Sequence, residues 1–253
     1  MQKDSVIKIS SVQNPKIIEV AKLKLKKYRE QGGLFLVEGE KLIKEAVTAG
    51  YKMKEIFYKK GIDYGGVYVK GAQVYELESA VIAKLSEMPS VPDIIAVFEI
   101  KEKKDSGGNF LILDNIQDSS NIGAIARSAY AAGFRTIFVL DCADIYSTKA
   151  LRSSMGAIFH LNIIKIKMSD LSKFKNSYLL NASMQGQNIF TMEHEKCDIG
   201  VVIGNEGHGV RKEIQNMCKK TISVPMQKGV ESLNAAVSAS IIMYAISYTL
   251  KSV

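Results

Sequence analysis

Cysteine and histidine are scarce in this chain, and their positions argue against two kinds of site. The three cysteines, Cys142, Cys197 and Cys218, are an odd number, lie far apart and form no CxxC pair. A disulfide framework or a zinc cluster is therefore not expected. The three histidines are equally scattered and no HExxH pattern occurs, so the sequence predicts no metal site.

Long apolar runs and a leader segment are missing as well. Apolar residues make up 47% of the 253 residues, yet no stretch approaches the roughly 18 uncharged apolar residues of a membrane-spanning helix. The most apolar stretch, residues 235–250, is interrupted by serines and tyrosines. Residues 1–5 are not followed by an apolar core with a small-residue cleavage site. We expect a globular, cytoplasmic protein with ample material for a core.

Basic residues exceed acidic ones, 34 against 26, and the excess is concentrated at one end. Residues 1–30 hold eight Lys and Arg but three acids. A polyanionic partner fits this surplus, which ordinary soluble proteins also show. Residues 15–30 combine lysines with apolar positions at helical spacing, after Asn14 as a cap and Pro15 in the first turn. This pattern predicts a basic amphipathic helix, either a nucleic-acid contact or a solvated face; its apolar positions are Ile18, Ala21, Leu25 and Tyr28.

Short apolar runs divide the chain into two α/β regions. Residues 1–100 hold four such runs and predict a small domain: Leu34–Val37, Ile56–Tyr58, Val67–Val69 and Ile94–Phe98. Residues 101–109 are charged, then Gly-rich, as expected of an exposed linker. In residues 110–253, apolar runs alternate with helical segments, which predicts a parallel sheet covered by helices; these runs are Phe110–Leu113, Thr136–Leu140, Leu161–Ile166, Tyr178–Leu180, Val201–Ile203 and Thr221–Val224.

Ligands bind at strand ends in such sheets, and three strand ends carry unusual residues. After the first run, residues 114–129 read DNIQDSSNIGAIARSA. Asn121 lies near a helix start, and Arg127 lies six residues later, where its side chain could extend toward an anion. The alternative is that Asn121 caps the helix and Arg127 is a surface charge.

The second junction reads IGNEGHG at residues 203–209. Its glycines allow a sharp turn and a close approach to a ligand, and Glu206 offers a carboxylate. The order is neither the dinucleotide GxGxxG fingerprint nor a P-loop, and a purely structural turn is the competing interpretation.

The third junction reads VPMQKGVESLN at residues 224–234. Ser232 and Asn234 stand at a helix start, where free backbone N–H groups and polar side chains could surround a pocket.

Taken together, NIGAIARSA, IGNEGHG and VPMQKGVESLN resemble the SpoU/TrmH branch of the SPOUT RNA methyltransferases, and the likeness spans residues 110 to about 250. Residues 1–100 resemble the ribosomal-protein-like substrate-binding domain often fused to this family, through SxxNPK, KKYR and FLVEG. One departure is Ser119 where relatives often have proline, which predicts a looser turn before Asn121.

The resemblance implies a deep trefoil knot in the carboxy-terminal domain that holds S-adenosylmethionine in a bent conformation, and a protein that works as a homodimer. Carried over by motif, the cofactor site comprises Ala182, Gly204, Val224, Met226 and Leu233. The residues expected to act in catalysis are Asn121, Arg127, Glu206, Ser232 and Asn234. The implied reaction is methylation of a ribose 2′-hydroxyl in RNA, with ribosomal RNA of the large subunit as the first choice and tRNA as the second.

Arg127 is the family's expected activating residue, but a guanidinium holds its proton too tightly to be a ready general base. Physical chemistry therefore favours a role in positioning and charge stabilisation at the target phosphate.

Two rival hypotheses are an RNA-binding ribosome-assembly factor that no longer catalyses, and a methyltransferase that modifies a base. Titration with the cofactor tests the first rival, and mass spectrometry of digested RNA tests the second.

Overall fold

The computed structural model describes residues 6–64, 66, 67, 69–193 and 197–249. Residues 1–5 lie outside the described residues, so the structure does not bear on the prediction that they form no leader segment. His194, one of the three scattered histidines, also lies outside them. The chain forms two compact units, residues 1–102 with 146–152, and residues 103–145 with 153–253. Each unit contains one β-sheet and its own helices.

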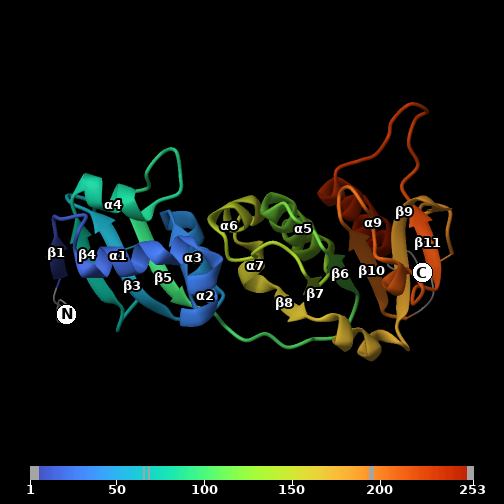
Figure 1. Cartoon of the computed structure of the whole chain (residues 1–253), viewed down its shortest axis with the longest axis horizontal. Coiled ribbons are helices and arrows are strands. Elements are labelled where there is room, and N and C mark those ends of the chain that lie inside the picture. Colours follow the sequence, from blue (N-terminus) through green and yellow to red (C-terminus); the bar gives the residue numbers. More distant parts are fainter. Residues whose placement is uncertain (1–5, 65, 68, 194–196, 250–253) are drawn as a thin grey trace. The chain divides into compact units, whose positions relative to one another are not determined.

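The first unit contains a five-stranded mixed sheet in the order β1-β4-β3-β5-β2. Strands β1, β4 and β3 run parallel, while β5 is antiparallel to β3 and β2. The elements of this unit, coloured blue to green in Figure 1, are β1 (Val6–Ile9), α1 (Pro15–Ala21), η1 (Lys22–Lys24), α2 (Lys26–Gly32), β2 (Leu34–Glu38), α3 (Glu40–Thr48), β3 (Met53–Lys59), β4 (Gln73–Leu77), α4 (Ser79–Leu85) and β5 (Ile94–Glu99).

The expected helix over residues 15–30 begins as predicted but is not continuous. Asn14 caps α1 by accepting a hydrogen bond from Lys16 N, and Pro15 occupies the first turn. Leu25 then adopts extended backbone angles and separates η1 from α2. Within α1, Ile17 and Val20 are buried and Ile18 is 41% exposed, and Leu25 at the break is 60% exposed. The predicted apolar face is therefore wrong at Ile18 and Leu25, whereas Ala21 packs against the core and Tyr28 is partly buried.

The expected strand at Val67–Val69 is also wrong. Val67 lies in a turn and Val69 has no regular structure, while residue 68 is not described. The strand of this region is β4, six residues later, whose Val74, Tyr75 and Leu77 are buried. The strand was predicted at the wrong position because the apolar run at residues 67–69 is a stronger sequence signal than the alternating pattern QVYEL of β4.

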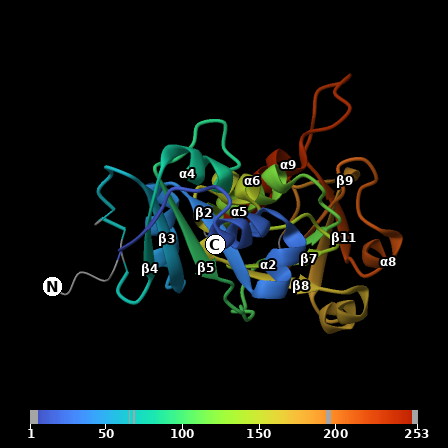
Figure 2. The same cartoon turned by 60° about the vertical axis from the view of Figure 1, so that its left-hand side comes forward.

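The second unit contains a six-stranded sheet in the order β11-β9-β10-β6-β7-β8, and every neighbouring pair is parallel. This confirms the predicted parallel-sheet α/β class. Its elements, green to red in Figure 1 and seen from another side in Figure 2, are β6 (Phe110–Asp114), α5 (Ser119–Ala132), β7 (Thr136–Leu140), α7 (Ala157–His160), β8 (Asn162–Ile166), η2 (Met168–Phe174), β9 (Tyr178–Asn188), β10 (Ile199–Gly204), α8 (Lys212–Gln215), β11 (Lys220–Ser223) and α9 (Ala235–Thr249). Helix α6 (Thr148–Ser154) belongs to the first unit up to Arg152 and to the second from Ser153.

Strands β6 and β7 are buried along their whole length, as expected of central strands with continuous apolar runs. Helix α5 packs beside α9, where Ser240 Oγ donates to Ser128 Oγ at 2.7 Å and Ser247 Oγ donates to the Ala132 carbonyl at 2.7 Å. The small residues of α9 thus serve a close contact between two helices. The knot implied by the family resemblance stays a prediction, because strand order alone does not define the path of a knot.

Candidate active site

The candidate site lies where parallel strands of the second unit end together. The register pairs Asp114 of β6 with Gly204 of β10 and with Leu140 of β7. The loops that follow β6 and β10 therefore leave the same edge of the sheet. The loop after β11 brings a third polar segment, residues 225–234, which leads into α9. These are the three junctions that the sequence singled out.

A chain of side-chain hydrogen bonds joins the three junctions. Asn121 Nδ2 donates to Glu206 Oε1 at 2.8 Å, and Asn234 Nδ2 donates to Asn121 Oδ1 at 3.0 Å. Asn121 is only 8% exposed, so both ends of its amide are used inside the protein. Residues that are 85 and 113 positions apart thus meet in one polar cluster. We call Glu206, Asn121 and Asn234 the amide chain.

The two asparagines of the amide chain stand in different relations to the starts of α5 and α9. Asp118, not Asn121, caps α5 by accepting a hydrogen bond from Ser120 N at 2.8 Å. The interpretation of Asn121 as a helix cap is therefore wrong. Asn234 stands directly before α9, and its Oδ1 accepts a hydrogen bond from Ala236 N at 2.8 Å, so the predicted position of Asn234 at a helix start is confirmed.

The loop after β10 is a tight turn that fixes Glu206. Asn205 and Gly209 exchange two backbone hydrogen bonds, at 3.0 and 2.9 Å, and Asn205 Oδ1 accepts from the N–H groups of Gly207 and His208. A Cβ atom on Gly204 would lie 2.2 Å from the backbone of Gly209. Only glycine fits at position 204, because the turn folds back against its own strand. The turn is thus both structural and suited to presenting a carboxylate.

A buried ion pair that the sequence analysis missed anchors the same turn. Asp114 is fully buried, and its Oδ1 and Oδ2 accept from Arg211 Nε at 2.7 Å and Arg211 N at 2.8 Å. Arg211 Nη1 also donates to Asp141 Oδ2 at 2.8 Å. The hydrogen bond with Asp114 raises the pKa of the Arg211 guanidinium above its ordinary value. A carboxylate that ends the apolar run FLILD was a signal for Asp114, but nothing near Arg211 marked it as the partner.

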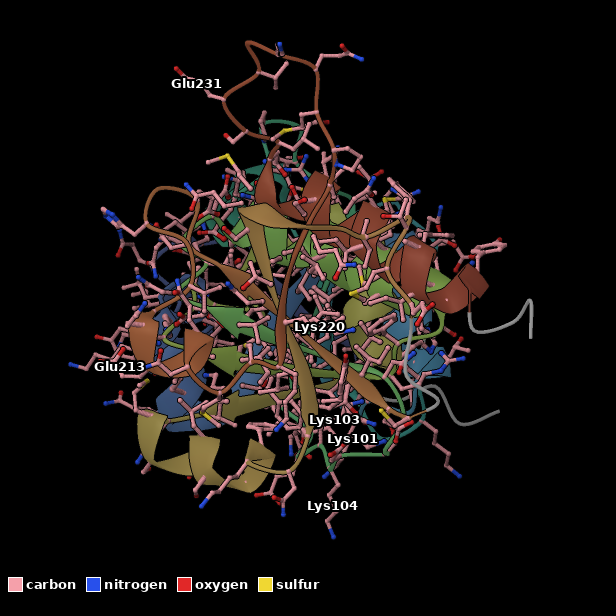
Figure 3. The ribbon with its side chains drawn as sticks, turned by 90° about the vertical axis from the view of Figure 1, so that its right-hand side faces the viewer. Lys101, Lys103, Lys104, Glu213, Lys220 and Glu231 are labelled. Atoms are coloured by element: carbon pink, nitrogen blue, oxygen red, sulfur yellow. The ribbon has the colours of Figure 1, made fainter. Side chains whose placement is uncertain are left out.

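A cavity of about 510 Å³ opens beside this turn. Its volume falls in the range of roughly 300–1,000 Å³ that is typical of small-molecule sites. The five residues predicted to hold the cofactor all lie on its wall, together with Glu206, Ser232 and Asn234: they are Ala182, Gly204, Val224, Met226 and Leu233. Figure 3 shows the loop after β11 extending from the body of the unit, with Glu231 at its outer part.

A second, shallower hollow of about 330 Å³ lies between the starts of α5 and α9. Its wall includes Asn121 and Asn234, and also Ser153 near the end of α6. Ser153 belongs to none of the three motifs, and no pattern in the sequence places it beside α5 and α9. The rest of the wall consists of Ser120, Ala124, Ala236, Val237 and Ser240. Asn234 belongs to both the cavity and the hollow.

Arg127 is the one predicted catalytic residue that lines neither space. Its side chain is exposed on α5, and no hydrogen bond or ion pair joins it to another described residue. It lies one turn after Ala124 and seven residues after Ser120, hence on the same face of the helix.

Among the described residues, no group of three or more His, Cys, Asp and Glu side chains is arranged to hold a metal ion. Over the same part of the chain, no helix combines the length and the apolar character needed to cross a membrane.

Both units match known protein families. Residues 108–244 match the SpoU rRNA methylase family, and residues 14–96 match the MRM3-like substrate binding domain. A similar curated protein is the 23S rRNA (guanosine(2553)-2′-O)-methyltransferase RlmP of Bacillus subtilis. It is 30% identical over 241 residues, which cover 93% of this chain and 97% of that protein.

Solved structures show the same fold. An AdoMet-bound rRNA methyltransferase from Sinorhizobium meliloti superposes with a TM-score of 0.87 at 23% identity, over 97% of this chain and 98% of that one. A structure described as an RNA 2′-O ribose methyltransferase has a TM-score of 0.83 at 26% identity, over 98% of this chain and all of the other. On the strength of the family match, the near full-length relative and the three motifs that meet at one sheet edge, this chain belongs to the SpoU rRNA methylase family.

Proposed function

We propose that this protein transfers a methyl group from S-adenosylmethionine to a ribose 2′-hydroxyl of large-subunit ribosomal RNA. The observation that carries the proposal is the amide chain, which joins the three motif loops between a ligand-sized cavity and a polar hollow. The B. subtilis relative is named for this reaction on a guanosine of 23S rRNA. A ribosomal RNA substrate makes the cytoplasm the proposed location.

The cavity suits S-adenosylmethionine in size and chemistry. Apolar side chains such as Ile222, Leu233 and Ile242 line it and would pack against a flat purine. Glu206 is the only acidic residue among the described residues of its wall, and the cofactor carries positive charge on its sulfonium and ammonium groups. The S. meliloti neighbour was crystallised with this cofactor bound. We infer that Ala182, Gly204, Val224, Met226 and Leu233 hold it here.

When bound, the cofactor supplies an electrophilic methyl group on a sulfonium, which becomes a neutral thioether. The ribose oxygen forms the new O–C bond, the C–S bond breaks, and the hydroxyl proton passes to a phosphate oxygen or to water. Alignment of the two reactants supplies much of such an acceleration. The amide chain holds the loops in place, and Ser232 and Asn234 offer a hydroxyl and an amide at the site where the acceptor enters. Arg127 binds and neutralises the phosphate beside the target ribose.

The first unit supplies the proposed RNA-binding domain, residues 1–100, with residues 101–109 as the linker and 110–253 as the catalytic domain. Lys22, Lys26 and Lys27 are exposed around the break at Leu25. Two of these ammonium groups, those of Lys22 and Lys27, lie 5.8 and 6.0 Å from the ring centre of Tyr28. Exposed cations beside an aromatic ring suit contact with RNA phosphates and bases.

The proposed oligomer is a homodimer through α9. Val237, Tyr244 and Tyr248 are 46%, 39% and 64% exposed and are spaced by seven and four residues, so they form one stripe. Tyr244 and Tyr248 stack on each other at 5.9 Å. Sedimentation of the wild type against a Tyr244→Glu variant tests this interface. A variant that remains a dimer would contradict it.

The central test of the function is replacement of Arg127 by alanine. We expect Arg127→Ala to lower the turnover of transcribed 23S rRNA by about 1,000-fold or more, because the phosphate is no longer positioned. The affinity for S-adenosylmethionine, measured by calorimetry, should stay unchanged. Arg135→Ala is the matched control, since Arg135 is an exposed arginine that stacks on the Tyr130 ring of the same unit. Wild-type turnover by Arg127→Ala would reject the assignment.

A labelling experiment distinguishes the substrate classes. Purified protein is incubated with labelled S-adenosylmethionine and with unmodified 23S rRNA or tRNA, and digested RNA is analysed by mass spectrometry. We expect the label on a ribose of 23S rRNA. A label on tRNA would mean that tRNA, not 23S rRNA, is the substrate, and a label on a base would mean that the enzyme does not methylate ribose. Absence of cofactor binding would favour a non-catalytic RNA-binding protein.

A further inference from the structure

Two connecting segments cover one face of the sheet in the second unit. The segment with η2 joins β8 to β9, and the segment with α8 joins β10 to β11. Phe174 of η2 and Ile214 of α8 belong to one core cluster with strand residues such as Phe138. The described residues of this cluster include none from α5, α7 or α9. Because successive strand residues point to opposite faces, those three helices cover the other face of the sheet.

Charge is divided unevenly between the two faces. Helices α5, α7 and α9 together carry one charged residue, Arg127. On the opposite face, residues 167–177 and 210–219 carry two exposed acids, Asp170 and Glu213, and Figure 3 shows Glu213 at the left of the unit. The same two segments carry five exposed lysines, which we call the basic face: Lys167, Lys173, Lys175, Lys212 and Lys219.

The charges of the basic face are available to a partner. None of its lysines forms an ion pair with a described residue, whereas the neighbouring Arg211 is bound to Asp114 and Asp141. Lys173 is also held in place, because its Nζ lies 4.6 and 5.0 Å from the ring centres of Phe138 and Phe174. A cation whose stem already packs on aromatic rings loses less conformational freedom when it binds an anion.

The spread of these lysines favours a polyanion over a small anion. Neighbouring strands lie about 4.8 Å apart, so a sheet of this size is roughly 24 Å wide. The segment with η2 begins at one edge strand, β8, and Lys219 directly precedes the other edge strand, β11. A single phosphate would contact only a small part of this width, whereas an RNA segment carries phosphates along its whole length. Lysine binds phosphate as a point charge, and such contacts carry no information on base sequence.

We propose that the basic face binds phosphates of the substrate RNA outside the nucleotide that is methylated. The inference rests on the proposed methylation of 23S rRNA and adds a second RNA contact to that of the first unit. The basic face lies on the opposite side of the sheet from α9, so it stays open in the proposed homodimer. A contact of this kind raises the affinity for RNA and leaves the methyl transfer step unchanged.

Removing three charges from the basic face tests the proposal. Lys173→Gln, Lys175→Gln and Lys219→Gln are combined, because glutamine keeps most of the side-chain length and loses the charge. We expect the KM for transcribed 23S rRNA to rise about tenfold, and the slope of log affinity against log salt, measured by filter binding, to fall by about 2. The kcat and the affinity for S-adenosylmethionine should stay within about twofold of wild type.

The matched control removes the same number of positive charges from the first unit. Lys44→Gln, Lys52→Gln and Lys60→Gln change exposed lysines that already pair with Glu40, Glu99 and Glu78. Both triple variants have the same net charge, so only the location of the lost charge differs. Arginine at positions 173, 175 and 219 restores the charge, and we expect it to restore the salt slope and the affinity for RNA.

The outcomes separate this inference from the function on which it rests. A wild-type protein without turnover on any RNA would sink the proposed function, while filter binding still measures the RNA contact. Wild-type RNA affinity and salt slope in the glutamine variant would overturn the basic face alone. An equal loss in the control variant would overturn it as well, because net charge would then explain the effect. So would a loss that arginine does not restore, because the lysines would then act through the fold and not through their charge.

Discussion

Both units bury some charged groups, Arg29 and Glu38 in the first and Asp114 in the second, but they differ in where their ion pairs lie. In the first unit, ion pairs such as Lys44–Glu40 and Lys52–Glu99 lie on the surface with both partners exposed. In the second unit, Asp114 at the sheet edge is fully buried and Asn121 nearly so, while their neighbours Glu206 and Asn234 are exposed. Exposed pairs contribute little to folding and remain free to exchange partners, whereas buried groups require fixed partners. The first arrangement suits reversible binding of a polyanion, and the second suits a site with one geometry.

Among the changes that compare the two units, the largest effect should come from cutting the amide chain in the second unit. With Asn121→Ala and Glu206→Ala combined, we expect turnover of 23S rRNA to fall by 100-fold or more, because the loops after β6 and β10 lose their direct link. Steady-state kinetics measures this change. As a control, Glu231→Ala alters an exposed acid on the loop after β11. Unchanged turnover in the double variant would show that the motif residues have been assigned wrongly.

A smaller effect, on stability, should distinguish buried from exposed charge. Arg211→Met leaves Asp114 buried without its cation, and we expect the free energy of unfolding to fall by about 3 kcal/mol. Lys44→Met in the first unit should change it by less than about 0.5 kcal/mol, because the Glu40 partner stays in water. Urea denaturation measures both variants. Equal losses of unfolding free energy in the two variants would contradict the expected difference between a buried and an exposed ion pair.

The smallest effect should be on RNA affinity and should appear when charges of the first unit are removed. Replacing Lys22, Lys26 and Lys27 by alanine is expected to weaken binding of 23S rRNA about tenfold and to reduce the slope of log affinity against log salt by about 2. Turnover at saturating RNA should stay near wild type. The control replaces Lys52, Lys54 and Lys60, which already pair with Glu99 or Glu78. An unchanged salt slope would argue against this surface as the RNA contact.

Deleting residues 1–30, a simpler way to remove the basic segment, would confuse this test. The segment also carries Ile17, Val20 and Leu23, which are buried in the core of the first unit with Leu77 and Leu85. Their loss would open a cavity and destabilise the unit. The lysine variants change charge alone because these side chains are exposed.

Sequence alone predicted the second unit better than the first. Six apolar runs from Phe110 to Val224 each coincide with a strand, because parallel central strands are buried on both faces and appear as continuous apolar segments. In the first unit, β1 and β4 were missed, since a half-exposed strand such as VIKI has a weak pattern. The helix break at Leu25 was missed because the apolar spacing continues through it in a slightly different phase.

The sequence by itself determined the parallel-sheet class, the three loops that carry polar residues, and the family to which they belong. Only the tertiary structure decided that Glu206, Asn121 and Asn234 form one hydrogen-bonded cluster, that Arg211 pairs with Asp114, and that Ser153 lines the same hollow as residues of α5 and α9. The physical reason is the separation along the sequence of the residues that interact. Strand and helix patterns depend on neighbours a few residues apart, whereas these contacts join residues about 85 to 113 positions apart that the register of β6 and β10 and the packing of α5 and α9 bring together.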